Sequence, residues 1–169
     1  LVQWLDETSS GPFACAQGKR VIELGAGCGI AGLALSMRGA AVTFTDTPEV
    51  CPHLEANVRT NLASLNMPSA AVLPNLWGSD PIAAGLAPPY DIVVATDCIY
   101  LAEQIEPFVA SLAALSDSGT SCIVVLERRD EGVCCDEESR RREQAHRWRL
   151  PRRRVQGTEE AAAAVYQCG

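Results

Sequence analysis

The stretch VIELGAGCGIAG at residues 21–32 decides the fold, because its glycines fall into two overlapping patterns. Counted from Gly27 it reads G-C-G-I-A-G, which fits the dinucleotide-binding pattern G-x-G-x-x-G. Counted from Gly25 it reads G-A-G-C-G, with the acid Glu23 two residues upstream. The two registers predict different ligands, so the position of the first glycine relative to the preceding strand must separate them.

Apolar runs rich in valine and isoleucine recur around this stretch, and we interpret them as buried parallel strands. Segments with apolar residues at helical spacing separate the runs, so the order predicts a doubly wound, mostly parallel α/β sheet of Rossmann-like type. The expected strands are residues 20–24, 41–45, 70–74, 91–96 and 121–127, with weaker strands at 153–156 and 163–167. Four helices are expected. The first begins near Ile30, and the second begins at Thr47 as N-cap with Pro48 at its first helical position. The other two cover about 103–115 and 136–148.

Length and composition are those of one globular domain of 169 residues. The sequence shows no apolar run long enough to cross a bilayer and no signal-peptide layout, and it begins at Leu1, so we expect an upstream piece to be missing. The eight cysteines form no C-x-x-C pair, and no histidine lies at zinc-ligand spacing from them. We therefore expect reduced thiols, no metal site, and a cytoplasmic or nuclear protein.

The net charge of −7 is unevenly distributed. Residues 1–127 hold 4 basic and 13 acidic side chains, whereas 10 of the 14 lysines and arginines lie between Arg128 and Arg154. An acidic body disfavours nucleic-acid binding and would attract basic protein surfaces. The arginine-rich segment is interleaved with acids, so we interpret it as a solvated helix face, with RNA binding as the alternative.

The register of the glycines favours the count from Gly25. A dinucleotide fingerprint places its first glycine directly after the strand. The strand is expected to end at Leu24, so Gly25 makes the turn, and the sixth residue from it is Ile30 rather than glycine. The count from Gly27 fits the pattern but leaves two residues after the strand unexplained, and Gly32 is more simply a close-packing position on the next helix.

Two acids lie where they could contact the ligand, and one of them distinguishes between the two candidate cofactors. Glu23 lies at the end of a buried strand, where a carboxylate needs a partner. A pyrophosphate would repel it, whereas the ammonium and sulfonium groups of S-adenosylmethionine would attract it, directly or through backbone and water. Asp46 ends the second strand and is placed to accept hydrogen bonds from ribose hydroxyls, which would serve NAD equally well. Glu23 therefore favours S-adenosylmethionine as the cofactor.

Five segments in this order resemble the seven-strand, class I methyltransferases, and more narrowly the methyltransferase-like protein-lysine methyltransferases grouped as family 16. They are GKRVIELGAGCGIAGLAL (18–35), VTFTDTPEV (42–50) with EANVRTN (55–61), LWG (76–78), ATDCIY (95–100) and ERRD (127–130). The resemblance covers residues 19–129, about two-thirds of the chain. It implies S-adenosylmethionine-dependent methyl transfer, without a metal, to a lysine side chain of a protein substrate.

The resemblance also assigns roles to individual residues. On the cofactor side it implies Gly25, Ala26 and Gly27 at the methionine, Asp46 at the ribose, Trp77 at the adenine, and Thr96 nearby. On the acceptor side it implies Asp97 and Tyr100. Methyl transfer needs a neutral amine, although a free lysine has a pKa of about 10.4. A partly desolvated pocket beside a sulfonium would lower that pKa, and Asp97 could orient the amine.

We expect residues 1–169 to form one monomeric methyltransferase domain that lacks its N-terminal segment. The family carries a tryptophan-bearing segment before the region equivalent to Leu1, and the match fades beyond Arg129, so 130–169 is a divergent, arginine-rich part. Three alternatives stay open. They are a methyltransferase for a small molecule or nucleic acid, a non-catalytic module that keeps the fold, and a nicotinamide-dependent oxidoreductase in the Gly27 register.

Overall fold

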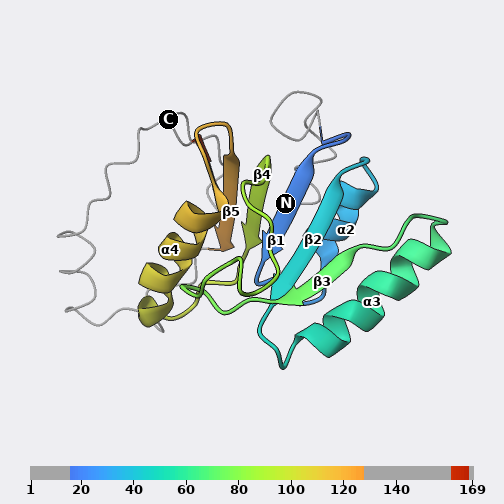
Figure 1. Cartoon of the computed structure of the whole chain (residues 1–169), viewed down its shortest axis with the longest axis horizontal. Helices are drawn as coiled ribbons and strands as arrows, with labels where there is room; N and C mark the ends of the chain where they lie inside the picture. The colour runs from blue at the N-terminus through green and yellow to red at the C-terminus, as the bar shows by residue number, and fades with distance from the viewer. Residues whose placement is uncertain (1–15, 128–160, 168–169) are drawn as a thin grey trace.

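A computed structural model of the chain describes residues 16–127 and the backbone of residues 161–167 (Figure 1). Its centre is a six-stranded sheet in the order β3-β2-β1-β4-β5-β6. Neighbouring strands from β3 to β5 run parallel, and β6 pairs antiparallel with β5. The strands are β1 (Arg20–Leu24), β2 (Ala41–Asp46), β3 (Ala71–Pro74), β4 (Ile92–Thr96), β5 (Ser121–Glu127) and β6 (Ala161–Gln167). The predicted doubly wound α/β fold is confirmed.

Helices cover both faces of this sheet. They are α2 (Ile30–Ser36), α3 (Cys51–Ser64), the short 3₁₀ helix η1 (Ala102–Gln104) and α4 (Ile105–Leu115). The alternation of side chains along β1 separates two cores, because Val21 packs with α2 and α3 whereas Ile22 and Leu24 pack with α4. Among the described residues, no helix is long and apolar enough to cross a membrane.

The strand order fixes where a ligand can bind. From β1 the chain winds outward to β2 and β3, and then returns to the other side of β1 as β4. In open parallel sheets a ligand binds beyond the carboxyl ends of the strands, where the winding direction reverses. That point lies between β1 and β4, whose registered pairs end at Leu24 and Ala95.

The start of α3 corrects one prediction. Thr47 is not the N-cap, because the helix begins at Cys51 with Val50 as its N-cap residue. The N–H of Thr47 donates to Oδ1 of Asp46 at 2.7 Å, which holds residue 47 against the strand end. The Thr47 carbonyl then accepts from the N–H groups of Val50 and Cys51 in a turn. Pro52 lies in the first turn, where its missing N–H costs little.

The other boundaries differ less. The predicted helix over 103–115 is divided into η1 and α4, and the Gln104 side chain accepts from the N–H of Leu101 at 3.3 Å at the start of η1. The weak strand predicted at 163–167 is confirmed as β6. The predicted strand at 153–156 and helix at 136–148 lie outside the described residues.

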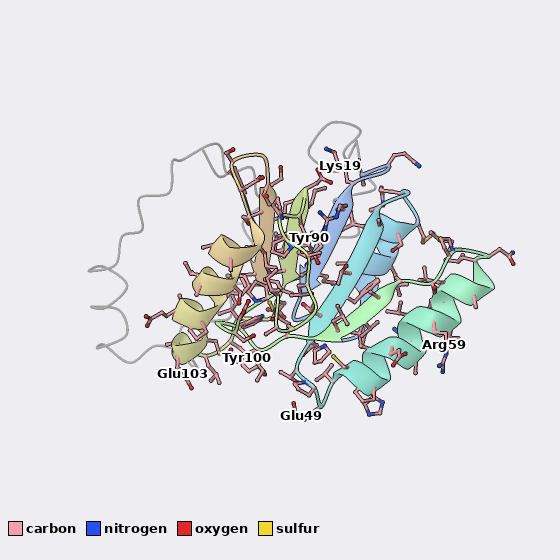
Figure 2. The ribbon with its side chains drawn as sticks, viewed as in Figure 1. Lys19, Glu49, Arg59, Tyr90, Tyr100 and Glu103 are labelled. Carbon is pink, nitrogen blue, oxygen red and sulfur yellow. The ribbon has the colours of Figure 1, made fainter. Side chains whose placement is uncertain are left out.

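Charge is distributed unevenly between the two ends of the strands. Lys19 precedes β1 at the amino end, where its Nζ lies 3.4 Å from Oδ1 of Asp91. In Figure 2, Lys19 lies at one end of the sheet, whereas Glu49, Tyr100 and Glu103 lie toward the other end. The carboxyl end of the strands, where a ligand is expected, is therefore the acidic end.

Candidate functional site

The loop after β1 is a sharp turn that only glycine can make easily. Gly25, Gly27 and Gly29 have φ values of 61°, 55° and 77°, in the left-handed region that other residues avoid. A Cβ on Gly25 would lie 2.6 Å from Cβ of Cys98 and 3.2 Å from Cζ2 of Trp77. A Cβ on Gly27 would meet no atom within 4 Å. Gly25 is thus enclosed by protein, and open space lies next to Gly27.

These positions support the count from Gly25. Strand β1 ends at Leu24 and Gly25 begins the turn, as predicted. The N–H of Gly27, which a pyrophosphate would need, already donates to Oδ2 of Asp46 at 2.8 Å. A carboxylate in that position would also repel a phosphate. The dinucleotide register is therefore disfavoured by both geometry and charge.

Asp46 organises the carboxyl end of β2. Its two oxygens accept from different backbone groups, Oδ2 from Gly27 and Oδ1 from Thr47. The neighbouring N–H of Ala26 donates to the Thr45 carbonyl at 3.0 Å, so the loop is also tied to β2 through the backbone. Each carboxylate oxygen keeps a further lone pair, which can accept a hydroxyl of a sugar.

Glu23 is buried below the loop, with 1% of its surface exposed. Its Oε2 accepts from the N–H of Gly32 at 2.9 Å, and its Oε1 has no partner among the described residues. Burial raises the pKa of Glu23 to about 8; the Gly32 bond lowers it, and the negative charge of Asp46 raises it further. The carboxyl group is thus bonded to α2, so its role toward a cofactor stays a prediction.

Trp77 forms a wall beside the glycine loop. Its ring packs edge-on against Phe108 of α4, with the centroids 5.0 Å apart and an interplanar angle of 71°. The next residue is anchored to the same helix, because the N–H of Gly78 donates to Oγ of Ser111 at 2.9 Å. The loop after β3 therefore lies against both the start of α4 and the turn at Gly25.

Thr96, Asp97 and Tyr100 follow one another at the end of β4. Thr96 is half-buried and pairs with Val125 of β5. Asp97 is exposed and has a φ of 48°, an uncommon conformation for a residue with a side chain, and its N–H donates to the Val125 carbonyl at 2.7 Å. Such strained backbone is often found at functional sites. Tyr100 is 57% exposed, so both predicted acceptor-side residues lie at the surface.

Three supporting residues were not predicted. Cys98 packs against Gly25, and burial raises the pKa of its thiol to about 12, so it is a neutral spacer. Asn57 of α3 donates from Nδ2 to the Cys28 carbonyl and so holds the tip of the loop. Asn75 is buried, and its N–H donates to the Asp46 carbonyl at 2.8 Å. In the sequence each is a polar or small residue within a motif, and its supporting role becomes visible only from its contacts.

Two solved methyltransferases have a similar fold. An O-methyltransferase family protein from Burkholderia thailandensis superposes with a TM-score of 0.69 at 14% identity, over 98% of this chain and 54% of that one. The magnesium protoporphyrin IX methyltransferase of Synechocystis PCC 6803, solved with bound SAM, gives 0.61 at 19% identity, over 98% and 76%. At these identities the likeness shows the fold alone, that of the class I methyltransferases.

Sequence similarity narrows the class. The model of the lysine methyltransferase family matches residues 1–142. EEF1A lysine methyltransferase 3 from Xenopus tropicalis is 36% identical over 115 residues, covering 68% of this chain and 50% of that protein. Protein N-lysine methyltransferase METTL21A from Danio rerio is 36% identical over 118 residues, covering 66% and 53%. The chain belongs to the lysine methyltransferase family, and it spans about half the length of these curated relatives.

Proposed function

We propose that this chain transfers a methyl group from S-adenosylmethionine to the side-chain amine of a lysine in a protein substrate. One observation carries the proposal: Gly25, Trp77 and Cys98 meet where β1 and β4 end. In the chain, Asp97 and Tyr100 stand on either side of Cys98, just after β4. A turn that can hold a cofactor therefore adjoins an exposed acid and phenol. The same features in a member of the lysine methyltransferase family favour lysine as the acceptor.

The residues of the loop fit S-adenosylmethionine, which supplies a methyl group on a sulfonium. Open space next to Gly27 leaves room for the methionine part, and Ala26 lies between the two glycines that bend the backbone. Asp46 keeps lone pairs for the ribose hydroxyls. The ring of Trp77 offers an apolar surface for the adenine, and Thr96 lies at the adjoining strand end.

Glu23 would act on this cofactor from below the loop. A positive charge near the loop would favour the ionised form of its buried carboxyl group. The hydrogen bond from Gly32 to Oε2 fixes the orientation of that group relative to α2. In that ionised form Glu23 would supply a negative charge to the cofactor, directly or through backbone and water.

The acceptor-side residues position the lysine. The amine attacks when it is neutral, so it must lose the proton that it carries at its ordinary pKa of about 10.4. The carboxylate of Asp97 can accept a hydrogen bond from the neutral amine and hold its lone pair toward the methyl group. Tyr100 lines the approach with its ring and hydroxyl. Most of the rate enhancement then comes from orientation.

We also propose a cytoplasmic or nuclear location, a monomeric state, and action on protein rather than on nucleic acid or membrane. The four cysteines of residues 16–127, namely Cys28, Cys51, Cys98 and Cys122, are free thiols, which suits a reducing compartment. The acidic carboxyl end of the sheet suits a protein surface and would repel phosphate groups.

A calorimetric titration with S-adenosylhomocysteine, run beside NAD, tests the cofactor assignment. We expect binding of the homocysteine compound alone. Asp46→Ala should weaken it at least about tenfold, because charge-assisted hydrogen bonds are lost. Asp46→Asn keeps one acceptor oxygen, so its affinity should fall between those of Asp46→Ala and the unaltered chain. Glu55→Ala, on the exposed face of α3, is the control and should bind as the unaltered chain does. Binding of NAD without the homocysteine compound would overturn the proposal.

Transfer of radiolabelled methyl groups tests the activity itself. Incubation of the chain with labelled S-adenosylmethionine and cell lysate should label protein, and hydrolysis of that protein should yield methylated lysine. Label in nucleic acid or in small molecules, with none in protein, would instead assign a different acceptor.

A further inference from the structure

Large apolar side chains are exposed around the start of α4. Leu76 and Tyr100 are 56% and 57% exposed, and Leu101 and Ile105 are 46% and 39% exposed. Leu101 directly precedes η1 and Ile105 begins α4, so the two side chains flank the short 3₁₀ turn that leads into this helix. Exposed apolar groups that gather in one region mark interaction sites more often than scattered ones do.

Contacts between the loop after β3 and helix α4 bring these residues into one region. A Cβ on Gly78 would lie 3.4 Å from Cβ of Pro107, and the N–H of Gly78 bonds to Ser111, so the loop that carries Leu76 lies against α4. Three exposed acids belong to the same region. We call this surface the α4 rim; its members are Leu76, Asp97, Tyr100, Leu101, Glu103, Ile105 and Glu106.

Among the described basic residues, Lys19 and Arg20 lie at the opposite end of the strands from the α4 rim, and Arg59 lies on α3. The sequence has no lysine or arginine between Arg59 and Arg128. Lys19 and Arg20 lie at the amino end of β1, and Arg20 is engaged there, because its guanidinium donates to the carbonyl of Pro89 at 2.8 Å. Figure 2 shows Glu103 and Tyr100 together and Lys19 at the far end of the sheet.

We propose that the α4 rim is the docking surface for a basic segment of the substrate protein, in which lysine or arginine residues and a large apolar residue flank the methylated lysine. This inference rests on the proposed methyl transfer, since it places the segment beside Asp97. Glu103 and Glu106 attract the flanking cations, and Leu101 and Ile105 cover the apolar side chain. The acids also repel phosphates, which disfavours RNA and anionic lipid as occupants.

Three synthetic peptides, each with a single lysine, test the docking chemistry. The first has flanking arginines and a leucine, the second has glutamine in place of each arginine, and the third has serine in place of the leucine. Binding is measured by fluorescence anisotropy on the 169-residue chain saturated with S-adenosylhomocysteine. We expect the first peptide to bind about tenfold more tightly than the second at low salt, and the difference to shrink at about 0.5 M salt.

Matched variants locate the surface. Glu106→Lys should weaken binding of the first peptide about tenfold, whereas Glu55→Lys, the same charge change on α3, should leave it unchanged. Leu101→Ser should weaken it severalfold, whereas Leu65→Ser, at a leucine 45% exposed beyond the end of α3, should not. The unaltered chain should bind the third peptide as weakly as Leu101→Ser binds the first peptide. Leu101→Ser should not weaken binding of the third peptide further.

The outcomes separate this inference from the proposed function. Equal binding of the first two peptides, or equal effects of Glu106→Lys and Glu55→Lys, overturns the docking surface. A concentration-dependent dimer that Leu101→Ser abolishes also overturns it, because a second copy would then be the occupant. Selective binding of the basic peptide without any methyl transfer leaves the α4 rim in place and overturns the proposed activity.

Discussion

The N–H of Gly27 donates a 2.8 Å hydrogen bond to Oδ2 of Asp46, and this bond joins the glycine loop to the end of β2. The two residues belong to separate motifs 19 positions apart. The bond means that a cofactor would meet a loop and a carboxylate that are already fixed relative to each other. Preorganisation of this kind reduces the entropy lost on binding.

The two glycines of the loop should respond differently to alanine. Both have left-handed φ values, which cost an alanine roughly 1–2 kcal/mol. Gly25→Ala also clashes with Cys98 and should destabilise the fold further, whereas Gly27→Ala projects into open space and should fold. We expect Gly27→Ala to weaken binding of S-adenosylhomocysteine, measured by calorimetry, and Gly25→Ala to lower the melting temperature more. Affinity at Gly27→Ala equal to that of the unaltered chain would contradict the assignment.

Gly32→Ala should destabilise the protein although alanine is the better helix former. The added Cβ would lie 2.3 Å from Cε1 of Phe44 and 2.5 Å from Oε2 of Glu23, both fully buried. Overpacking of this kind costs about 1–3 kcal/mol, which outweighs a helix-propensity gain of about 1 kcal/mol. Urea unfolding measures the difference. Gly119→Ala, where the nearest atom is 3.4 Å away, is the control and should change little.

Glu23 should make stability fall as pH rises. The ordinary pKa is 4.5 and burial raises it to about 8, so between these values the native state keeps a proton that the unfolded chain loses. The free energy of unfolding then decreases by up to about 1.4 kcal/mol per pH unit across this window and levels off above it. Denaturant titrations at several pH values should show this slope. Glu23→Gln should abolish it, whereas the exposed control Glu103→Gln should leave it intact.

Asp97→Asn should separate chemistry from binding. Asparagine tolerates the φ of 48° at this position, so the backbone bond from residue 97 to Val125 should persist. Loss of the carboxylate should lower methyl transfer by about a hundredfold or more. Affinity for S-adenosylhomocysteine should be unchanged. A normal transfer rate in this variant would show that the carboxylate takes no part in the reaction.

The sequence predicts the strands well because buried parallel strands need continuous valine and isoleucine runs, as in β4. It also predicts the turn at Gly25, since the conformation restricts the residue type. It does not predict the displaced start of α3, because that depends on the bond between Thr47 and Asp46. The contact of Cys98 with Gly25 was missed for a similar reason: it joins residues far apart in the chain.

A proline hinders the addition of further strands at the β3 edge of the sheet. β3 is the edge strand, only four residues long, and it ends at Pro74. The N–H of Asn75 points inward to the Asp46 carbonyl, so the nitrogen of Pro74 faces the open edge, where it has no hydrogen to offer. Another molecule therefore finds almost no backbone donors with which to extend the sheet at β3. This edge thus resists the strand-to-strand aggregation to which a longer, fully hydrogen-bonding edge would be prone.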